Sequence, residues 1–166
     1  MIPGQRLILA GLMDWLVADT AAVHYAGRRP MGTRGMESIV ALAAALRSPG
    51  GLTTDCSETV TLLLKLAGCS DPNGLNFNGA GNTETLLDHL THYERPGRAN
   101  IGALVVFDPA VKHGAVLGRH VCMVRKPGPD PVLFSHGQER DPVYVKLSNE
   151  RVGGTEPYVL LDVSKL

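Results

Sequence analysis

A cysteine stands at the predicted start of a helix, where a thiol has chemistry that an ordinary buried cysteine lacks. Cys56 follows loop-like residues 51–55, and the apolar spacing over 58–67 predicts a helix. Unpaired N–H groups and the positive end of the helix dipole favour a thiolate there, above all beside an imidazolium. The same N–H groups can hold a developing oxyanion. Cys56 is therefore a candidate nucleophile, and the alternative is a free cysteine that is buried and inert.

Two histidines are candidates for the groups that would activate this thiol. His120 opens the predicted strand 120–124, and His136 lies near the end of the predicted strand 132–137. If these strands pair antiparallel through the turn between them, the first residue of one lies near the last residue of the other. The two imidazoles would then lie side by side, as a base and the residue that orients it. The alternative for each histidine is a half-buried strand residue with a satisfied ring.

The other two cysteines favour packing roles. Cys69 follows the end of a predicted helix, and Cys122 lies inside an apolar strand. The chain has three cysteines, an odd number without metal-ligand spacing. Neither a disulfide framework nor a metal site is therefore expected, and a reducing compartment is the simpler interpretation.

The order of the predicted elements indicates an α+β fold. Helical spacing or composition occurs in four segments, at 5–26, 36–47, 58–67 and 82–93. Five short β-rich runs follow, at 103–107, 120–124, 132–137, 143–147 and 158–163. Helices first and strands afterwards predict N-terminal helices packed on an antiparallel sheet of about five strands. A length of 166 residues favours one domain, with a helical part over about 1–95 and a sheet over about 100–166.

Composition argues against several classes of partner. Sixteen lysines and arginines balance sixteen aspartates and glutamates. No basic stripe predicts binding to nucleic acid or to an anionic membrane. No run approaches the ~20 apolar residues of a membrane span. The apolar N-terminus is interrupted by Asp14 and Asp19 and lacks a small-residue cleavage site, so neither a signal peptide nor a transmembrane segment is expected.

Three stretches together resemble the NlpC-type cell-wall peptidases, a papain-like superfamily that also includes the CHAP amidases. TTDCSETVTLLLKLAG, at 53–68, resembles the family's DCS-G-x-V signature. IGALVVFDPAVKHGAVLGRHVCMV, at 101–124, resembles its GDLVFF…HVGIY block, and PVLFSHGQ, at 131–138, resembles the strand that follows. The resemblance covers about 21–137. It implies a papain-like fold of the NlpC type.

The same resemblance implies a reaction and three catalytic roles. The reaction would be hydrolysis of an amide bond in the peptide part of bacterial peptidoglycan, through a thioester and without a metal or organic cofactor. Cys56 would attack the carbonyl as a thiolate. His120 would take the thiol proton and return it to the leaving amine. His136 would hold His120 in the productive tautomer.

Further residues are candidates for the oxyanion and substrate sites. The backbone N–H of Cys56 or Ser57 would serve the oxyanion, because both begin the predicted helix. Tyr25 is the nearest match to a tyrosine that family members place near that site. Gln138 follows His136 and is a candidate for lining the substrate cleft, with an ordinary polar loop as the alternative.

The resemblance extends to NlpC-like proteins of tailed phages that infect actinobacteria. It implies a location in the host cytoplasm or in a phage virion. The expected partners are peptidoglycan peptide and, in a virion, other tail or head proteins. Two other functions stay open. One is a structural or interaction protein of the virion that retains the fold, and the other is a thiol acyltransferase or amidase with a substrate outside the wall.

Overall fold

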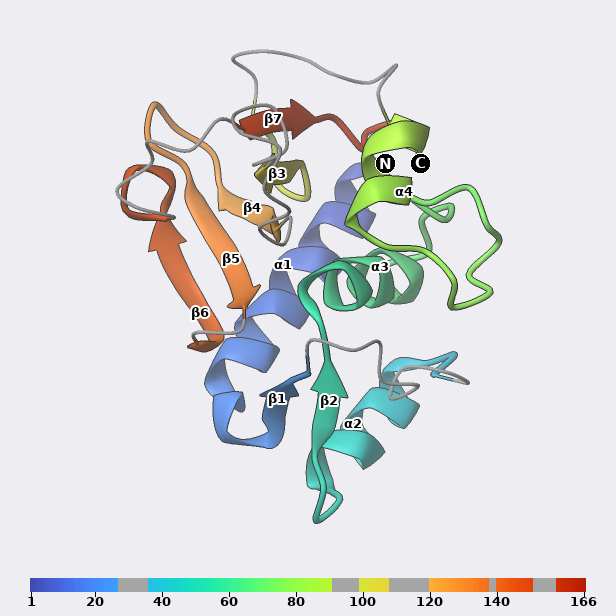
Figure 1. The fold of residues 1–166 in the computed structure, drawn as a ribbon. Coiled ribbons are helices and arrows are strands. Elements are labelled where there is room, and N and C mark those ends of the chain that lie inside the picture. The colour runs from blue at the N-terminus through green and yellow to red at the C-terminus, as the bar shows by residue number, and fades with distance from the viewer. Residues whose placement is uncertain (27–35, 91–98, 108–119, 138–139, 151–157) are drawn as a thin grey trace, which may run out of the picture.

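The computed structural model describes residues 1–26, 36–90, 99–107, 120–137, 140–150 and 158–166, and these form an α+β fold (Figure 1). Its four helices are α1 (Pro3–Ala18), α2 (Ile39–Arg47), α3 (Cys56–Leu66) and α4 (Thr83–Leu90). The main sheet contains β3 (Leu104–Phe107), β4 (His120–Lys126), β5 (Val132–Gly137), β6 (Arg140–Lys146) and β7 (Tyr158–Leu161). Its order is β6-β5-β4-β3-β7, with every neighbouring pair antiparallel. The predicted fold class and five-stranded antiparallel sheet are confirmed.

Two short strands correct the predicted boundaries in the N-terminal half. β1 (Val23–Tyr25) and β2 (Leu52–Thr54) pair in parallel, where the sequence predicts the end of a helix and a loop. α1 ends at Ala18, since its C-cap Asp19 leaves the helical conformation (φ −99°, ψ 29°), and the Asp19 carboxylate accepts from the indole N–H of Trp15 at 2.6 Å. The apolar spacing continues beyond this point and hides the end of the helix. Strands of three residues are too short for alternation to reveal.

The helices of the described residues are short and mostly one-sided. α1, the longest, has 16 residues, and its buried side chains are Leu9, Ala10, Leu12, Met13 and Leu16. α3 buries one side against β4 and β5, with Val60, Leu63 and Leu64 almost fully enclosed. None of these helices has the length and hydropathy to cross a membrane.

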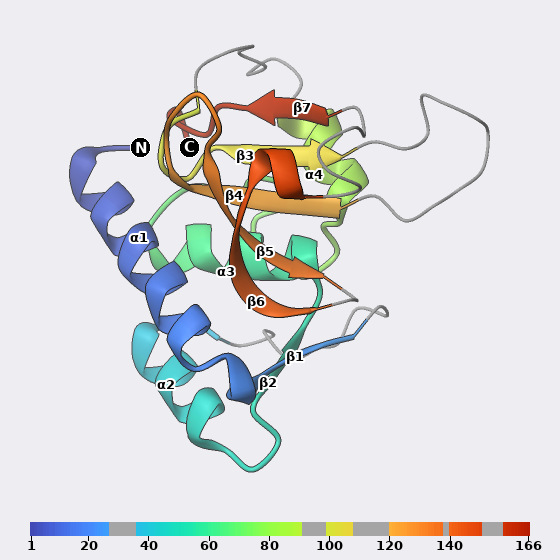
Figure 2. The same ribbon diagram turned by 90° about the vertical axis from the view of Figure 1, so that its left-hand side faces the viewer.

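The two faces of the sheet differ in what covers them. Alternate residues of β3 and β4 point toward the helices and join the larger core, which includes Leu104, Val106, Val121 and Met123. The remaining residues of those strands point the other way into a smaller apolar cluster made of Ala103, Val105, Phe107, Cys122, Val124 and Leu133. Figure 2 shows α1 and α3 beside the sheet, with α2 near β1 and β2. The larger core fixes α3 against the strand that carries His120.

Candidate active site

Helix α3 begins at Cys56 because the residue before it is a helix cap. Asp55 Oδ1 accepts a hydrogen bond from the backbone N–H of Glu58 at 2.7 Å and another from the hydroxyl of Ser57 at 2.8 Å. The cap satisfies the third amide of the helix and leaves those of Cys56 and Ser57 without helical partners. The predicted position of Cys56 at a helix start is confirmed, and two N–H groups and the positive end of the dipole lie beside its thiol.

The Cys56 thiol neighbours the His120 imidazole and is one of the groups that raise its pKa. His120 is the first residue of β4 and is 2% exposed, and Cys56 is 6% exposed. The His120 ring stacks on Phe107, its pairing partner in β3, with ring centroids 6.2 Å apart. Backbone pairing and ring stacking therefore hold the imidazole in one orientation beside the start of α3.

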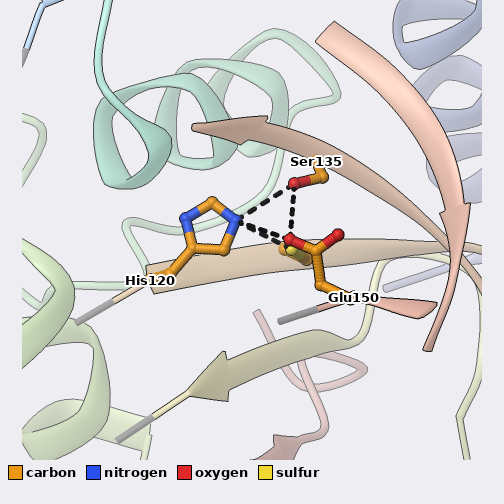
Figure 3. A network of polar contacts seen from close by, with 4 residues as sticks. His120, Ser135 and Glu150 are labelled. Atoms are coloured by element: carbon orange, nitrogen blue, oxygen red, sulfur yellow. Dashed lines mark hydrogen bonds and ion pairs between the residues drawn. The ribbon is translucent and has the colours of Figure 1, made fainter. Parts of the chain in front are cut away.

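The Nε2 atom of His120 faces a polar cluster of Cys122, Ser135 and Glu150. Figure 3 shows the serine and the glutamate converging on this nitrogen. Nε2 lies 3.1 Å from Ser135 Oγ, 3.2 Å from Cys122 Sγ and 3.4 Å from Glu150 Oε1. All four residues are buried, and Glu150 is 0% exposed. The site thus contains a carboxylate that is shielded from water and aimed at the imidazole.

The hydrogen-bond directions favour one tautomer of the His120 ring. The Ser135 hydroxyl donates to Glu150 Oε1 at 3.1 Å, so its oxygen accepts from His120 Nε2–H. We therefore assign a proton to Nε2. The other nitrogen, Nδ1, is turned away from the cluster in Figure 3 and is the basic atom of the neutral ring.

The surroundings raise the pKa of His120 well above its usual value. Burial alone would lower that pKa, but the Cys122 sulfur, the Cys56 thiol and the Glu150 carboxylate all raise it. A carboxylate 3.4 Å away in a buried site stabilises the imidazolium whatever the state of the two thiols. The site therefore stabilises the positive charge that the ring gains when it accepts a proton, and the charged ring stabilises a nearby thiolate.

His136 does not belong to this cluster, which corrects the expectation that it lies side by side with His120 and orients it. The register that sets Met123 of β4 opposite Phe134 of β5 puts Ser135, and not His136, on the face of the sheet that carries His120. Among the described residues, no hydrogen bond joins the two imidazoles. Successive strand residues point to opposite faces. Ser135, one position earlier, therefore faces His120 in place of His136.

His136 instead lies against β1 and β2. Its Nε2–H donates to the backbone carbonyl of Thr54 at 3.1 Å, and its ring meets the ring of Tyr25 edge-on at 5.4 Å. Nδ1 is buried and has no hydrogen-bond partner among the residues that the structure describes. Burial lowers the pKa of His136, although the Thr54 carbonyl opposes this. The ring is therefore held neutral.

The other predicted site residues are placed as follows. The Ser57 side chain is tied to the helix cap, so only its backbone N–H is available at the start of α3. Tyr25 lies in β1 beside His136. Gln138 falls outside the described residues. Cys69 is buried, as expected of a packing residue, and burial raises its pKa.

Sequence reasoning misses three members of the cluster, each for its own reason. Cys122 shares a face of its strand with His120, a signal that the sequence contains, although packing was the expected role. Ser135 alternates with His136, and only the pairing register of β4 and β5 decides which of them shares the face of His120. Glu150 follows a 3₁₀ turn at Leu147–Asn149, and nothing in its local sequence marks a buried carboxylate.

Comparison with known proteins finds no relative of this chain. No protein-family model, no curated protein and no solved structure matches the chain. What the site can do chemically therefore has to be inferred from its own residues.

Proposed function

We propose that the protein is a cysteine hydrolase that cleaves amide bonds in the peptide part of bacterial peptidoglycan. One observation supports the chemistry: the thiol at the start of α3 raises the pKa of a neighbouring imidazole whose Nε2 is held by a buried carboxylate and a serine. These groups match the roles of nucleophile, base and orienting acid. The choice of wall peptide comes from the resemblance of the Cys56 and His120 stretches to NlpC-type peptidases.

The first half of the proposed reaction is acyl transfer to sulfur. The Cys56 sulfur attacks the amide carbonyl carbon and forms a C–S bond, while its proton passes to His120. The N–H groups of Cys56 and Ser57 hold the oxyanion of the tetrahedral intermediate. His120 then gives the proton to the leaving amine as the C–N bond breaks, which leaves a thioester.

The second half is hydrolysis of the thioester. Water attacks the carbonyl carbon while His120 takes a proton from it, and the C–S bond breaks to release a carboxylic acid and the thiol. Glu150 balances the positive charge that His120 carries in each half, because its carboxylate oxygen lies 3.4 Å from Nε2. Glu150 is thus a positioning and charge-balancing residue in this scheme, the role that the sequence assigns to His136.

The test is cleavage of peptidoglycan fragments by the purified chain, with new amine and carboxyl termini identified by mass spectrometry. We expect Cys56→Ala to lower kcat/KM about 10³-fold or more. Cys69→Ala is the matched control, because it removes another buried thiol that lies outside the site, and it should retain activity. Cleavage that survives Cys56→Ala at the wild-type rate would refute the proposal.

A second measurement separates the proposal from its alternatives. Iodoacetamide should alkylate Cys56 rapidly near neutral pH, and His120→Gln should slow the reaction. Fast alkylation without cleavage of any wall fragment would replace the wall substrate with another acyl donor. A thiol that reacts slowly, in a chain that cleaves nothing, would favour a structural protein.

A further inference from the structure

We propose that His120, Cys122 and Glu150 form a binding site for a tetrahedral divalent transition metal ion of the Zn²⁺ type, and that a bound ion blocks the base of the proposed hydrolase. The metal site does not depend on the proposed function. Its inhibitory effect does, and the experiments below separate the two.

The three ligand atoms have the spacing of a tetrahedral site. Nε2, Sγ and a carboxylate oxygen all lie within 4.8 Å of one another. A zinc ion with ordinary bond lengths places its nitrogen and oxygen ligands about 3.4 Å apart, and its nitrogen and sulfur ligands about 3.6 Å apart. The corresponding separations here are 3.4 Å and 3.2 Å. The third pair, sulfur and carboxylate oxygen, lies within 4.8 Å and would have to settle at about 3.6 Å to seat the ion.

A fourth corner is already occupied by an oxygen. Ser135 Oγ lies 3.1 Å from His120 Nε2 and 3.1 Å from Glu150 Oε1, on the side where Figure 3 shows the groups converging. A serine hydroxyl or a water in its place would complete four-coordination. The three stronger ligands come from β4 and from the residue after a 3₁₀ turn, so the fold and not a local motif assembles them.

The ligand types select the class of metal. One thiolate, one imidazole and one carboxylate suit zinc or cobalt, whereas Mg²⁺ and Ca²⁺ require oxygen ligands. Charge points the same way, because a thiolate and a carboxylate would put two negative charges into a site whose residues are at most 2% exposed. Such charges are costly to bury without a partner, and a divalent cation balances both.

The bound metal would disable the base through the imidazole tautomer. A ring that gives its Nε2 lone pair to a metal keeps its proton on Nδ1. Without metal, the hydrogen bonds place that proton on Nε2 and leave Nδ1 basic. Loading the ion therefore moves the proton to the other nitrogen, and the ring can no longer accept the proton of the Cys56 thiol.

Co²⁺ is the direct probe of the site. The full chain, stripped with EDTA, should bind one equivalent and show the visible bands of tetrahedral cobalt together with a sulfur-to-cobalt charge-transfer band. Cys122→Ser should lose the sulfur band and bind at least ~100-fold more weakly, and Glu150→Gln should also bind more weakly. Cys69→Ala and Cys56→Ala should keep the wild-type spectrum. A wild-type chain without tetrahedral bands, or a sulfur band that survives Cys122→Ser, would overturn the metal site.

Zn²⁺ then tests the inhibition. It should suppress peptide cleavage and Cys56 alkylation in the wild type, and EDTA should restore both. In Cys122→Ser, the rate of each reaction without zinc divided by the rate with zinc should be smaller than in the wild type. Equal suppression in Cys122→Ser would mean that zinc acts elsewhere, which refutes the switch. Cobalt binding without hydrolysis would overturn the proposed function and leave the metal site standing. Hydrolysis without cobalt binding would overturn the metal site and leave the proposed function standing.

Discussion

Two buried histidines on neighbouring strands have opposite electrostatic surroundings. His120 is 2% exposed and His136 is 1% exposed, yet the pKa of the first is raised and that of the second is lowered. His120 faces the carboxylate of Glu150 and the sulfur of Cys122. His136 faces the Thr54 carbonyl and the ring of Tyr25. Burial alone lowers the pKa of both rings, so the neighbouring polar and charged groups decide which of them is the better proton acceptor.

The comparison shows that residue type and burial do not define a base. Both rings would pass as candidates in a search for buried histidines in strands. Only His120 has an acid that fixes its tautomer and a helix-start thiol that raises its pKa, which are the partners that catalysis by a cysteine requires. His136 has a structural explanation instead, since it links β5 to the backbone of β2.

The largest expected difference between the two regions is in catalysis. His120→Gln should lower kcat/KM for peptide cleavage about 10³-fold or more, because it removes the proton acceptor. His136→Gln should change it less than about tenfold, because that ring shares no hydrogen bond with His120. Steady-state kinetics of both variants on one wall fragment measure the ratio. Equal losses would mean that the two imidazoles act as a unit, as the sequence alone predicts.

What the sequence predicts well in this chain is local. The start of α3 at Cys56 and the strand that begins with His120 both follow from short-range patterns of apolar residues and a capping aspartate. The antiparallel sheet follows from short connections between β-rich runs. These features require only neighbours along the chain, and the structure places them as expected.

What the sequence misses is decided by tertiary geometry. The register that pairs Met123 with Phe134 puts Ser135 and not His136 on the face of the His120 imidazole, and no local pattern of residues fixes that register. Glu150 is buried by the turn that precedes it and not by any periodicity. The orienting acid of the site is therefore visible only in three dimensions.

The next largest difference is in stability. Glu150→Gln removes the charge that faces a buried imidazolium and should cost about 3–5 kcal/mol. His136→Gln removes one hydrogen bond to a backbone carbonyl and should cost about 1–3 kcal/mol. Urea denaturation near pH 6 gives both values, with the exposed Glu84→Gln as a control for loss of a glutamate. A cost for Glu150→Gln no greater than that of the control would show that the carboxylate does not stabilise His120.

The contributions of His120 and His136 to the free energy of unfolding should change with pH in opposite directions. Because the pKa of His120 is raised on folding, its contribution is complete below the unfolded value near 6.5 and is lost as pH rises through the folded pKa. Because the pKa of His136 is lowered, its contribution is complete above 6.5 and is lost as pH falls through the folded pKa. The unfolding free energy of His120→Gln should keep the pH dependence that His136 causes. That of His136→Gln should keep the pH dependence that His120 causes.

Histidine titrations by NMR and urea unfolding at several pH values measure this directly. Glu150→Gln should lower the pKa of His120 and leave that of His136 near its wild-type value. Two histidines that titrate together, or trends with the same sign in both variants, would remove the distinction between the regions.

The smallest expected effect concerns Tyr25, which meets His136 edge-on at 5.4 Å. Tyr25→Phe keeps the ring and Tyr25→Leu removes it, so the difference in their unfolding free energies isolates the aromatic contact, at about 0.5–1.5 kcal/mol. Neither variant should shift the pKa of His120, because that ring faces Glu150 and stacks on Phe107. Peptide cleavage by Tyr25→Phe is the decisive measurement. A loss of about 10²-fold or more would place the tyrosine hydroxyl at the oxyanion, as the resemblance implies, and would join the His136 region to catalysis.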